Sequence, residues 1–375
     1  MIDFSGATFD SRAVKPGMLF VALKGERSDG HDFIPQALEK GAVGVVDGLE
    51  ELQGLANEYR RSLKAKVIGI TGSAGKTTTK ELLKAFLSKA GKTHATDGNF
   101  NNHIGLPLTI LNCPDDVEFL VLEMGSNHPG EIAVLCDIAS PDVGVVTGVG
   151  TAHLEFFGSR QGIADEKGTL LAAARDFGVY PAADDFASVL ASRNSNAVAA
   201  EPAVGGLLDP ARTWPPHFAG NASLAFAVAA RFGVTVGRAA AALADFALPG
   251  ARWRISEKWG VTFIDDTYNA NPDSMIAALD ALAAMPCDGH RVAVLGDMFE
   301  LGPQSLELHK KVFAHALELG LPLVIGVGEM SSQCLCHLAY KDLATLKKKF
   351  RVDVSAGDVV LLKASHGMKL GDLLV

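Results

Sequence analysis

The sequence has few of the features that mark secreted, membrane or nucleic-acid-binding proteins. Its 375 residues include five cysteines, an odd number spread along the chain, which argues for reduced thiols rather than a disulfide framework. No apolar run approaches the ~18 residues of a membrane span, and the N-terminus lacks a signal-peptide pattern. With 34 basic and 43 acidic residues, the formal charge is −9, which disfavours general nucleic-acid binding. We expect a cytoplasmic protein without membrane insertion.

Composition and length indicate a multidomain α/β protein. Hydrophobic residues make up 48% of the chain and charged residues 21%, as in folded globular proteins. The chain is too long for one ordinary core and has room for two or three domains. Glycine is abundant (39 residues), whereas tryptophan (3) and tyrosine (4) are scarce, which suits folds with many tight turns. Because the net charge is negative, bound anions must be met by backbone amides, a helix end or a metal ion.

Short apolar runs alternate with amphipathic segments, which predicts parallel sheets covered by helices. We expect strands at residues 17–24, 43–46, 67–70, 119–124, 143–149, 178–181, 261–266, 291–297, 322–328 and 358–363. We expect helices at residues 33–42, 49–64, 80–91, 168–175, 221–232, 236–246, 273–284, 305–319 and 341–348. The pattern weakens between residues 167 and 216, and Leu248-Pro249-Gly250 indicates a linker.

A glycine-rich turn between an expected strand and an expected helix gives the strongest chemical signal. Backbone N–H groups in such a turn approach phosphate oxygens, and the N-terminus of the following helix favours negative charge. Lys76 can then reach the β- and γ-phosphates, and the Thr77 hydroxyl can bind Mg²⁺. The spacing is unusual because Ile70 stands where the standard motif has its first glycine. The predicted nucleotide-phosphate site consists of Gly72, Ser73, Ala74, Gly75, Lys76, Thr77 and Thr78.

Two further polar residues follow expected strands, at the sheet edge where ligands of open parallel sheets collect. Glu123 and His153 could join Thr77 in holding Mg²⁺. The alternatives are a solvent-facing glutamate and a structural histidine, and imidazole is an unusual ligand for this hard cation.

The segment after the expected strand at 261–266 has two interpretations. Asp266 could hydrogen-bond a ribose, and Asn269 or Asn271 could contact a base. Alternatively, the segment is an Asn/Pro turn in which Asp273 and Ser274 cap a helix. Both interpretations remain open on the residues alone. A zinc site at Cys334-Leu335-Cys336-His337 is disfavoured, because a second ligand pair is lacking.

These motifs together resemble the Mur ligase family along nearly the whole chain. Two of the matching strings, at 123–132 and 264–275, are specific to the branch that adds D-alanyl-D-alanine to a UDP-linked tripeptide. Folylpolyglutamate synthases are similar in the phosphate-binding loop but should lack both strings. The matching strings lie at residues 10–33, 70–81, 99–111, 123–132, 150–159, 264–275 and 294–302.

The resemblance implies three α/β domains and a reaction. Residues 1–64 would bind the UDP-sugar, residues 65–249 would form an ATP-binding domain with a P-loop ATPase-type parallel sheet, and residues 250–375 would form a Rossmann-like domain for the incoming dipeptide. The implied enzyme uses ATP and Mg²⁺ to phosphorylate the carboxylate of UDP-N-acetylmuramoyl-tripeptide. The amine of D-alanyl-D-alanine then attacks the acyl phosphate, which yields the amide, ADP and phosphate during peptidoglycan precursor synthesis. We expect a monomer.

The resemblance also implies roles for individual residues. Lys76 and Thr77 match the phosphate-loop lysine and the Mg²⁺-binding hydroxyl, and Glu123 and His153 match Mg²⁺ ligands. Lys167 matches a lysine that is carbamylated in the family and then binds a second Mg²⁺. The alternative for Lys167 is a surface lysine at a helix start. Lys76, Lys167 and His153 are therefore the expected catalytic residues.

Further roles concern ATP and the two substrates. Arg252 matches an arginine that contacts ATP from the last domain, Asp266 a ribose-binding carboxylate, and Asn221 the last residue of an adenine-side motif. Asn269 joins them as an expected cofactor contact. The expected substrate-binding residues are Ser11, Arg12, Asn101, Asn102, Thr109, Lys363 and Ser365.

The sequence also departs from the family pattern. Phe218 replaces an asparagine of the adenine-side motif, Ala251 replaces the glycine before the ATP-contacting arginine, and His366 stands at the acceptor-side cation. The span from Asp185 to Asn221 is much shorter than in the usual ligase. These departures leave two alternatives to the ligase: a non-catalytic nucleotide- or precursor-binding relative, and a ligase with a different acceptor.

Overall fold

A small parallel sheet forms the N-terminal part of the chain. The computed structural model describes residues 4–26, 28–201, 206–209, 214–244 and 246–374. Strands β1 (Ala7–Thr8), β2 (Leu19–Ala22) and β3 (Gly44–Asp47) pair in that order. Helices α1 (Ile34–Glu39) and α2 (Gly48–Ser62) follow β2 and β3. The expected strands and helices of this region are confirmed with shorter bounds.

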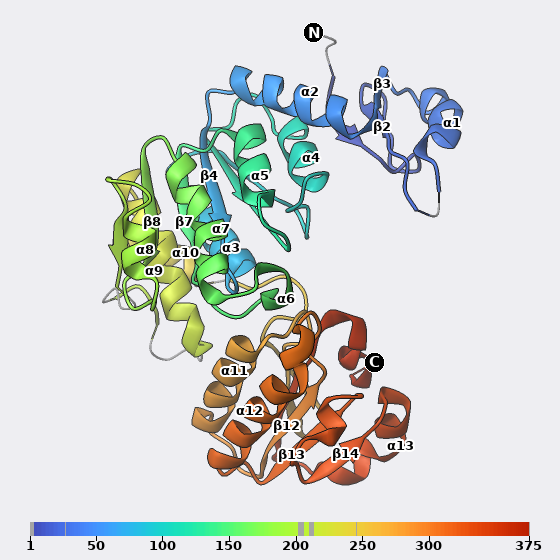
Figure 1. Ribbon diagram of the computed structural model, residues 1–375, viewed down its shortest axis with the longest axis vertical. Helices are drawn as coiled ribbons and strands as arrows, with labels where there is room; N and C mark the ends of the chain where they lie inside the picture. Colours follow the sequence, from blue (N-terminus) through green and yellow to red (C-terminus); the bar gives the residue numbers. More distant parts are fainter. Residues whose placement is uncertain (1–3, 27, 202–205, 210–213, 245, 375) are drawn as a thin grey trace. The chain divides into compact units, whose positions relative to one another are not determined.

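The second sheet has six parallel strands in the order β5-β6-β4-β7-β8-β9, of which Figure 1 labels β4, β7 and β8. Its strands are β4 (Lys66–Thr71), β5 (Thr93–Ala95), β6 (Phe119–Glu123), β7 (Val143–Val146), β8 (Phe177–Pro181) and β9 (Val198–Ala200). The accompanying helices are α3 (Lys76–Leu87), α4 (Gly105–Leu111), α5 (Glu131–Ala139), α7 (Arg160–Ala173), α8 (Ala187–Ala191), α9 (Pro216–Arg231) and α10 (Val236–Leu243). Strands β6 and β7 are buried throughout and flank β4, so the three carboxyl ends share one edge.

Two strand glycines allow α7 to approach this sheet closely. A Cβ atom on Gly69 would lie 2.8 Å from Cδ1 of Leu170, and one on Gly144 would lie 2.8 Å from the Leu170 carbonyl oxygen. Larger residues at these positions would push α7 away from β4 and β7. The close approach matters for function because α7 carries Lys167.

The third sheet lies in the C-terminal part and has the order β10-β11-β15-β12-β13-β14. Its strands are β10 (Arg254–Lys258), β11 (Val261–Asp265), β12 (Arg291–Gly296), β13 (Leu323–Val327), β14 (Leu338–Tyr340) and β15 (Val359–Lys363). Only β10 runs antiparallel to its neighbour. The helices between the strands are α11 (Pro272–Ala284), α12 (Ser305–Glu318) and α13 (Leu343–Asp353). The expected second α/β series is confirmed, and β10 and β14 were not foreseen.

The chain divides into two compact units. One comprises residues 1–149, 164–208 and 221–244, and the other comprises residues 150–163, 209–220 and 245–375. The second unit therefore includes the short helix α6 (Leu154–Phe157), which lies far from its other elements in the sequence. The domain breaks near residues 64 and 249 stay predictions.

Several bounds differ from the expected ones for physical reasons. Helix α7 begins at Arg160, whereas the expected helix began at residue 168. The expectation missed the first part because the polar and glycine residues ahead of the Ala-rich part give no amphipathic pattern. Every residue of α4 is buried, so this helix lacks the polar face that marks a helix in a sequence. Strands β5 and β9 have three residues each, too few for a clear pattern. Residues 202–205 and 210–213 of the stretch between Asp185 and Asn221 lie outside the described residues.

Two expectations about the whole chain can be compared with the structure. None of the helices in the described ranges has both the length and the apolar character needed to cross a bilayer. All five cysteines are free thiols, as their number and spacing predicted.

Candidate active site

The glycine-rich turn forms a loop between β4 and α3. Gly72 has φ +144° and Gly75 has φ +81°, backbone conformations that favour glycine. A Cβ atom on Gly72 would lie 2.0 Å from Oγ1 of Thr147, so no larger residue fits there. The segment after β7 braces the turn, because the Thr147 hydroxyl donates to the Ala74 carbonyl oxygen (2.5 Å) and Ser73 N donates to the Gly148 carbonyl oxygen (3.0 Å). These two contacts hold the loop in its shape.

The start of α3 presents the residues predicted to contact phosphate. Lys76 is the first residue of the helix, and its Nζ donates to the Gly72 carbonyl oxygen across the loop (2.6 Å). Thr77 is half-buried, whereas Thr78 is buried. The backbone N–H groups of this first turn lack the helical partners that later residues have, so they can donate to an anion.

Asn221 packs against this loop from α9. A Cβ atom on Gly75 would lie 2.4 Å from Oδ1 of Asn221, and the Thr79 hydroxyl donates to the same oxygen (3.3 Å). Asn221 is buried. The structure therefore joins Asn221 to the phosphate loop, although the two lie more than 140 positions apart in the chain.

Glu123 ends β6 at the edge of the sheet where β4 leads into the loop. It pairs in register with Ile70, and its side chain is buried (3% exposed). Oε1 accepts from Nδ2 of Asn101 (2.8 Å), whereas Oε2 has no hydrogen-bond partner among the described residues. A buried carboxylate oxygen without a donor is a costly arrangement that a bound cation would relieve.

Lys167 lies within α7 and is buried (2% exposed), so the alternative of a surface lysine at a helix start is wrong. Its Nζ donates to the hydroxyl (2.5 Å) and carbonyl oxygen (3.3 Å) of Ser126. Burial lowers the pKa of Lys167 to about 7, and the nearby charge of Lys76 adds to the shift. A substantial fraction of this amine is neutral near pH 7, the form that can react with carbon dioxide.

Ser126 and Glu166 are two residues of this region that the sequence interpretation missed. Glu166 is buried, and its carboxylate accepts from Gly130 N and Ile132 N, both at 2.8 Å. It thereby ties the start of α5 to α7 beside Lys167. Ser126 lies within the matching string at 123–132 and Glu166 directly precedes Lys167, so the resemblance marked their neighbourhood but not their contacts.

The donor set in this unit fits a hard cation. It offers the Thr77 hydroxyl and a carboxylate oxygen of Glu123 without a protein donor, both of the oxygen type that Mg²⁺ prefers. Among the described residues there is no group of three or more His, Cys, Asp or Glu side chains that could hold a metal ion. Any Mg²⁺ site would therefore depend on hydroxyl, modified lysine and substrate oxygens as well.

His153, the other predicted metal ligand, belongs to the second unit. It has a left-handed backbone (φ +58°) just before α6, and its Nδ1 lies 2.6 Å from Oε2 of Glu300. The same segment is held by Asp273, whose Oδ2 accepts from both the N–H (2.8 Å) and the hydroxyl (3.1 Å) of Thr151. The loop that carries Glu300 and the first turn of α11 therefore hold the segment that carries His153.

Asp266 and Lys363 form an ion pair at the ends of β11 and β15, in which Lys363 is buried and Asp266 is partly buried. Nζ of Lys363 lies 2.6 Å from Oδ2 of Asp266 and also donates to the Asn269 carbonyl oxygen (3.1 Å). Oδ1 of Asp266 accepts from Trp253 N (3.2 Å). The structure thus brings together three predicted residues, and the Lys363 charge is used to hold Asp266.

The capping alternative for the same segment is confirmed in part. Asn271 and Ser274 form a reciprocal capping box at the start of α11, so Asn271 has a structural task. Asp273 is not the cap, because its carboxylate binds Thr151. The ribose interpretation of Asp266 remains open beside this cap.

The other predicted residues of this unit have local partners. The Arg252 guanidinium lies 3.4 Å from the centre of the Tyr268 ring. Ser365 is buried, and its Oγ accepts from Phe299 N (2.9 Å). His366 is exposed, and its ring centre lies 5.8 Å from that of Tyr268. Tyr268 thus lies next to both Arg252 and His366, the residue that differs from the family's acceptor-side cation.

The predicted substrate residues of the N-terminal part differ in exposure. Ser11 is buried and donates to Oε1 of Gln36 (2.6 Å), whereas the Arg12 side chain is 83% exposed and pairs with Asp10 (2.9 Å). This pairing lowers the pKa of Asp10 to about 2. Of the two predicted residues Ser11 and Arg12, Arg12 is the one that a ligand could reach.

Asn102 and Thr109 both serve α4. Oδ1 of Asn102 accepts from Ile104 N (3.1 Å) and Gly105 N (2.9 Å), two N–H groups at the start of the helix. Thr109 is buried and donates to the Gly105 carbonyl oxygen (3.0 Å). The structure does not bring their side chains together with Ser11 and Arg12 through any described hydrogen bond.

The residues of the disfavoured zinc motif also have separate partners, since His337 Nδ1 accepts from Val324 N (3.0 Å).

A parallel sheet with a phosphate-binding loop, followed by a second α/β unit, defines a nucleotide-dependent enzyme. Comparison with known families specifies which one. Residues 3–86 match the model of the Mur ligase family catalytic domain, residues 70–201 the Mur ligase middle domain, and residues 251–366 the Mur ligase glutamate ligase domain.

Individual relatives match over nearly the whole chain. A UDP-N-acetylmuramoyl-tripeptide–D-alanyl-D-alanine ligase of Bacillus subtilis is 34% identical, covering 98% of this chain and 92% of its own. The enzyme of the same name from Escherichia coli is 36% identical, covering 100% and 93%. The crystal structure of MurF ligase from Thermotoga maritima in complex with ADP has a TM-score of 0.87 at 31% identity, covering 100% and 97%. MurF from Acinetobacter baumannii has the same TM-score at 30% identity, covering 98% and 92%.

The chain belongs to the Mur ligase family. It has the family's three-domain α/β fold and is an ATP-dependent enzyme of this family. The alignment with the Bacillus subtilis ligase spans 425 positions, whereas this chain has 375 residues, so at least 50 aligned positions have no counterpart here. That deficit agrees with the shortness noted in the sequence, while its place between Asp185 and Asn221 stays a prediction.

Proposed function

We propose that this enzyme joins D-alanyl-D-alanine to UDP-N-acetylmuramoyl-tripeptide in peptidoglycan precursor synthesis. The observation that carries the proposal is the match of 34–36% identity over nearly the whole chain to ligases named for this reaction. ATP would phosphorylate the tripeptide carboxylate, and the dipeptide amine would displace phosphate from the resulting acyl phosphate. The protein's part is to position the reactants and to neutralise charge.

The geometry of the phosphate loop supports the first step. The glycine-rich loop and the N-terminus of α3 would hold the ATP phosphates, and Lys76 Nζ, which donates to the Gly72 carbonyl oxygen, would donate to phosphate oxygens instead. Asn221, packed on Gly75, would keep the loop in this shape. Thr77, Glu123 and His153 would hold Mg²⁺, which would supply positive charge against the ATP phosphates.

We propose that Lys167 is carbamylated and supplies a further anionic ligand. Its lowered pKa, about 7, supports this because the neutral amine is the nucleophile that carbon dioxide requires. The product would be an anion at a site that otherwise buries a cation beside Lys76. The buried Oε2 of Glu123 supports the presence of a cation nearby.

The remaining assignments are proposals on the same basis. Arg252, Asp266 and Asn269 would contact ATP from the C-terminal domain, residues 250–375. Ser11 and Arg12 would contact the uridine side within residues 1–64, and residues 65–249 would carry the ATP site. We propose that the enzyme is a cytoplasmic monomer.

The acceptor needs its own test for two reasons. His366 stands where the family has its acceptor-side cation, and Lys363, an expected substrate-binding residue, is paired with Asp266. A ligase with a different acceptor is therefore the second candidate. Phosphate release should be measured with Mg²⁺, ATP and UDP-N-acetylmuramoyl-tripeptide against a panel of dipeptides. D-Alanyl-D-alanine should give the highest rate, and release should need both substrates. A higher rate with another dipeptide would favour the second candidate, and no acceptor-dependent release would favour a non-catalytic relative.

A further inference from the structure

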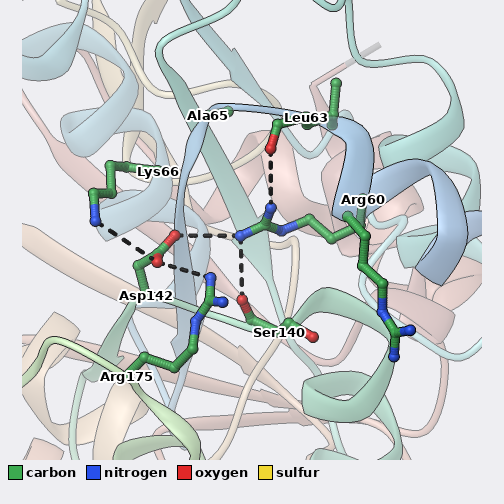
Figure 2. A pocket seen from close by; sticks show the side chains of 8 residues that line it. Arg60, Leu63, Ala65, Lys66, Ser140, Asp142 and Arg175 are labelled. Carbon is green, nitrogen blue, oxygen red and sulfur yellow. Dashed lines mark hydrogen bonds and ion pairs between the residues drawn. The ribbon is translucent and has the colours of Figure 1, made fainter.

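A cavity of about 320 Å³ lies at the opposite edge of the second sheet from the phosphate loop. The end of α2, the first residue of β4, the turn before β7 and the turn after α7 surround it (Figure 2). Strand β4 begins here at Lys66 and reaches the loop edge at Thr71, so about 17 Å of strand separates the two places. The polar residues that line the cavity are Arg60, Arg61, Lys66, Ser140, Asp142 and Arg175.

Arg60 and Asp142 form the fixed wall of this cavity. The buried Arg60 guanidinium donates to the carbonyl oxygens of Ala139 (2.8 Å) and Ser140 (3.2 Å), and to Oδ2 of Asp142 (3.2 Å). The same Oδ2 accepts from Val67 N (2.8 Å). As Figure 2 shows, Asp142 lies between basic side chains, so its charge is already neutralised by its neighbours.

Three other basic side chains lie around Arg60 and Asp142 and have hydrogen-bond donors available for a ligand. Arg175 is half-exposed and uses only Nη2, at 2.8 Å from Oδ1 of Asp142, in its hydrogen bonds with the described residues. Lys66 pairs with Asp176 (2.8 Å) and is also half-exposed. Arg61 is exposed and has no hydrogen bond or ion pair with a described residue.

The charge balance at this place is opposite to that of the whole chain. Four basic side chains line the cavity, against the carboxylates of Asp142 in the lining and Asp176 beside it, which leaves a net charge of about +2. Burial lowers the pKa of Arg60, and the charge of Arg175 also lowers it, against the opposing effect of Asp142. The whole chain carries −9. A local excess of positive charge in an acidic protein favours an anionic ligand.

We propose that this cavity is a binding site for a compact phosphate-type oxyanion, separate from the nucleotide site. Guanidinium groups match phosphate oxygens with paired donors, and Arg61 and Arg175 have such donors available. The volume is at the low end for small-molecule sites, which are ~300 Å³ or more, so it suits phosphate or pyrophosphate with some water. A bound anion would connect α2 with β4 and the turn after α7, and so stiffen the junction between the first and second sheets.

The test is calorimetric titration of the protein with pyrophosphate and with inorganic phosphate, in the presence of saturating Mg²⁺ and ADP to occupy the nucleotide site. The double variant Arg61→Ala/Arg175→Ala should weaken binding about tenfold, because it removes charge-assisted hydrogen bonds. The control is Arg238→Ala, which removes one exposed arginine from α10 in the same unit. It should change the affinity less than twofold. Equal affinities in the double variant and the unaltered protein would overturn the proposal.

A second measurement does not depend on the folding of the variants. Crystals of the unaltered protein soaked in tungstate should show an anomalous peak within the cavity lined by Arg61 and Arg175. Peaks confined to other places would overturn the proposal. Uridine monophosphate distinguishes the two sources of the phosphate group. If it binds more weakly than phosphate, with the same dependence on the two arginines, the ligand is a free oxyanion. Tighter binding with that dependence assigns a phosphate ester to the same site.

Discussion

Oε2 of Glu300 lies 2.6 Å from Nδ1 of His153, and both residues have left-handed backbones (φ +61° and +58°). Such conformations are costly for residues other than glycine and persist where surrounding contacts enforce them. A carboxylate this close to Nδ1 favours the proton on that nitrogen, which leaves Nε2 with its lone pair, the form in which imidazole binds a metal. Glu300 is therefore positioned to orient His153.

Replacing Glu300 by glutamine should reduce the affinity for the proposed Mg²⁺. Partners of metal ligands typically contribute ~10-fold or more to metal affinity or activity. The change should appear as a higher Mg²⁺ concentration at half-maximal ligase rate, with little change in stability. Glu318→Gln is the matched control, since Glu318 is exposed near the end of α12. An unchanged Mg²⁺ dependence for Glu300→Gln would show that the contact with His153 has no role in metal binding.

The uncarbamylated Lys167 should make the folded protein less stable at low pH than at high pH. The pKa of Lys167 is lowered from 10.5 to about 7 in the folded state. Below pH 7 both states carry the proton and the folded state bears the full cost of the buried charge. This cost falls as the pH rises from 7 to 10.5, because there the unfolded chain binds more protons. Lys167→Met should thus be more stable than the unmodified protein at pH 6, by an amount that shrinks toward pH 10.

The measurement is urea unfolding across that pH range in bicarbonate-free buffer. A Lys167→Met advantage that is the same at pH 6 and pH 10 would contradict the account of the buried amine. The same variant should lose ligase activity at every pH, because methionine can neither be carbamylated nor bind a cation.

Gly72→Ala should abolish nucleotide binding. A Cβ atom there would lie 2.0 Å from the Thr147 hydroxyl oxygen, and φ +144° disfavours alanine independently of space. The loop must therefore move away from the shape that fits phosphate. Calorimetric titration with ADP and Mg²⁺ would measure the loss.

Gly237→Ala provides the control for that substitution. Gly237 lies within α10, and a Cβ atom there would meet nothing within 4 Å. Alanine should preserve ADP affinity and stabilise the helix by up to ~1 kcal/mol. Tight ADP binding by Gly72→Ala would show that this turn is not the phosphate loop.

Breaking the ion pair of Asp266 and Lys363 should destabilise the C-terminal unit. Asp266→Asn would leave the buried Lys363 ammonium without its counter-charge, which typically costs about 3–5 kcal/mol. The double variant Asp266→Asn/Lys363→Met should recover most of this loss, since it removes the uncompensated charge. Urea unfolding of the two single variants and the double variant gives the coupling energy. If the losses of unfolding free energy in the single variants add up to that of the double variant, the interaction between Asp266 and Lys363 contributes little to stability.

The phosphate loop could be predicted from the sequence because its information is local. A strand, two glycines with special backbone conformations, Lys76 and a helix follow one another within about twenty residues. Most of the longer strands and helices were predictable for the same reason, since each of these has its own periodic pattern, whereas β5, β9, β10 and β14 were not foreseen. Bounds failed where the pattern was absent, as in α7 and the fully buried α4.

Contacts between distant residues could not be predicted in this way. Nothing near Lys167 indicates its burial, which depends on Gly69 and Gly144 letting α7 approach the sheet. Glu300 and His153 meet although 146 residues separate them, and so do Asn221 and Gly75. The resemblance to a family supplied candidate roles for several of these residues, but the partners Ser126, Glu166 and Glu300 emerged only from packing.

The central claim is that the tripeptide carboxylate is activated as an acyl phosphate before the dipeptide attacks. The most direct measurement uses UDP-N-acetylmuramoyl-tripeptide labelled with ¹⁸O in the reacting carboxylate, together with ATP, Mg²⁺ and D-alanyl-D-alanine, and mass spectrometry of the released phosphate. The account predicts that one labelled oxygen per turnover appears in phosphate and the other remains in the new amide. Phosphate free of the label would contradict it.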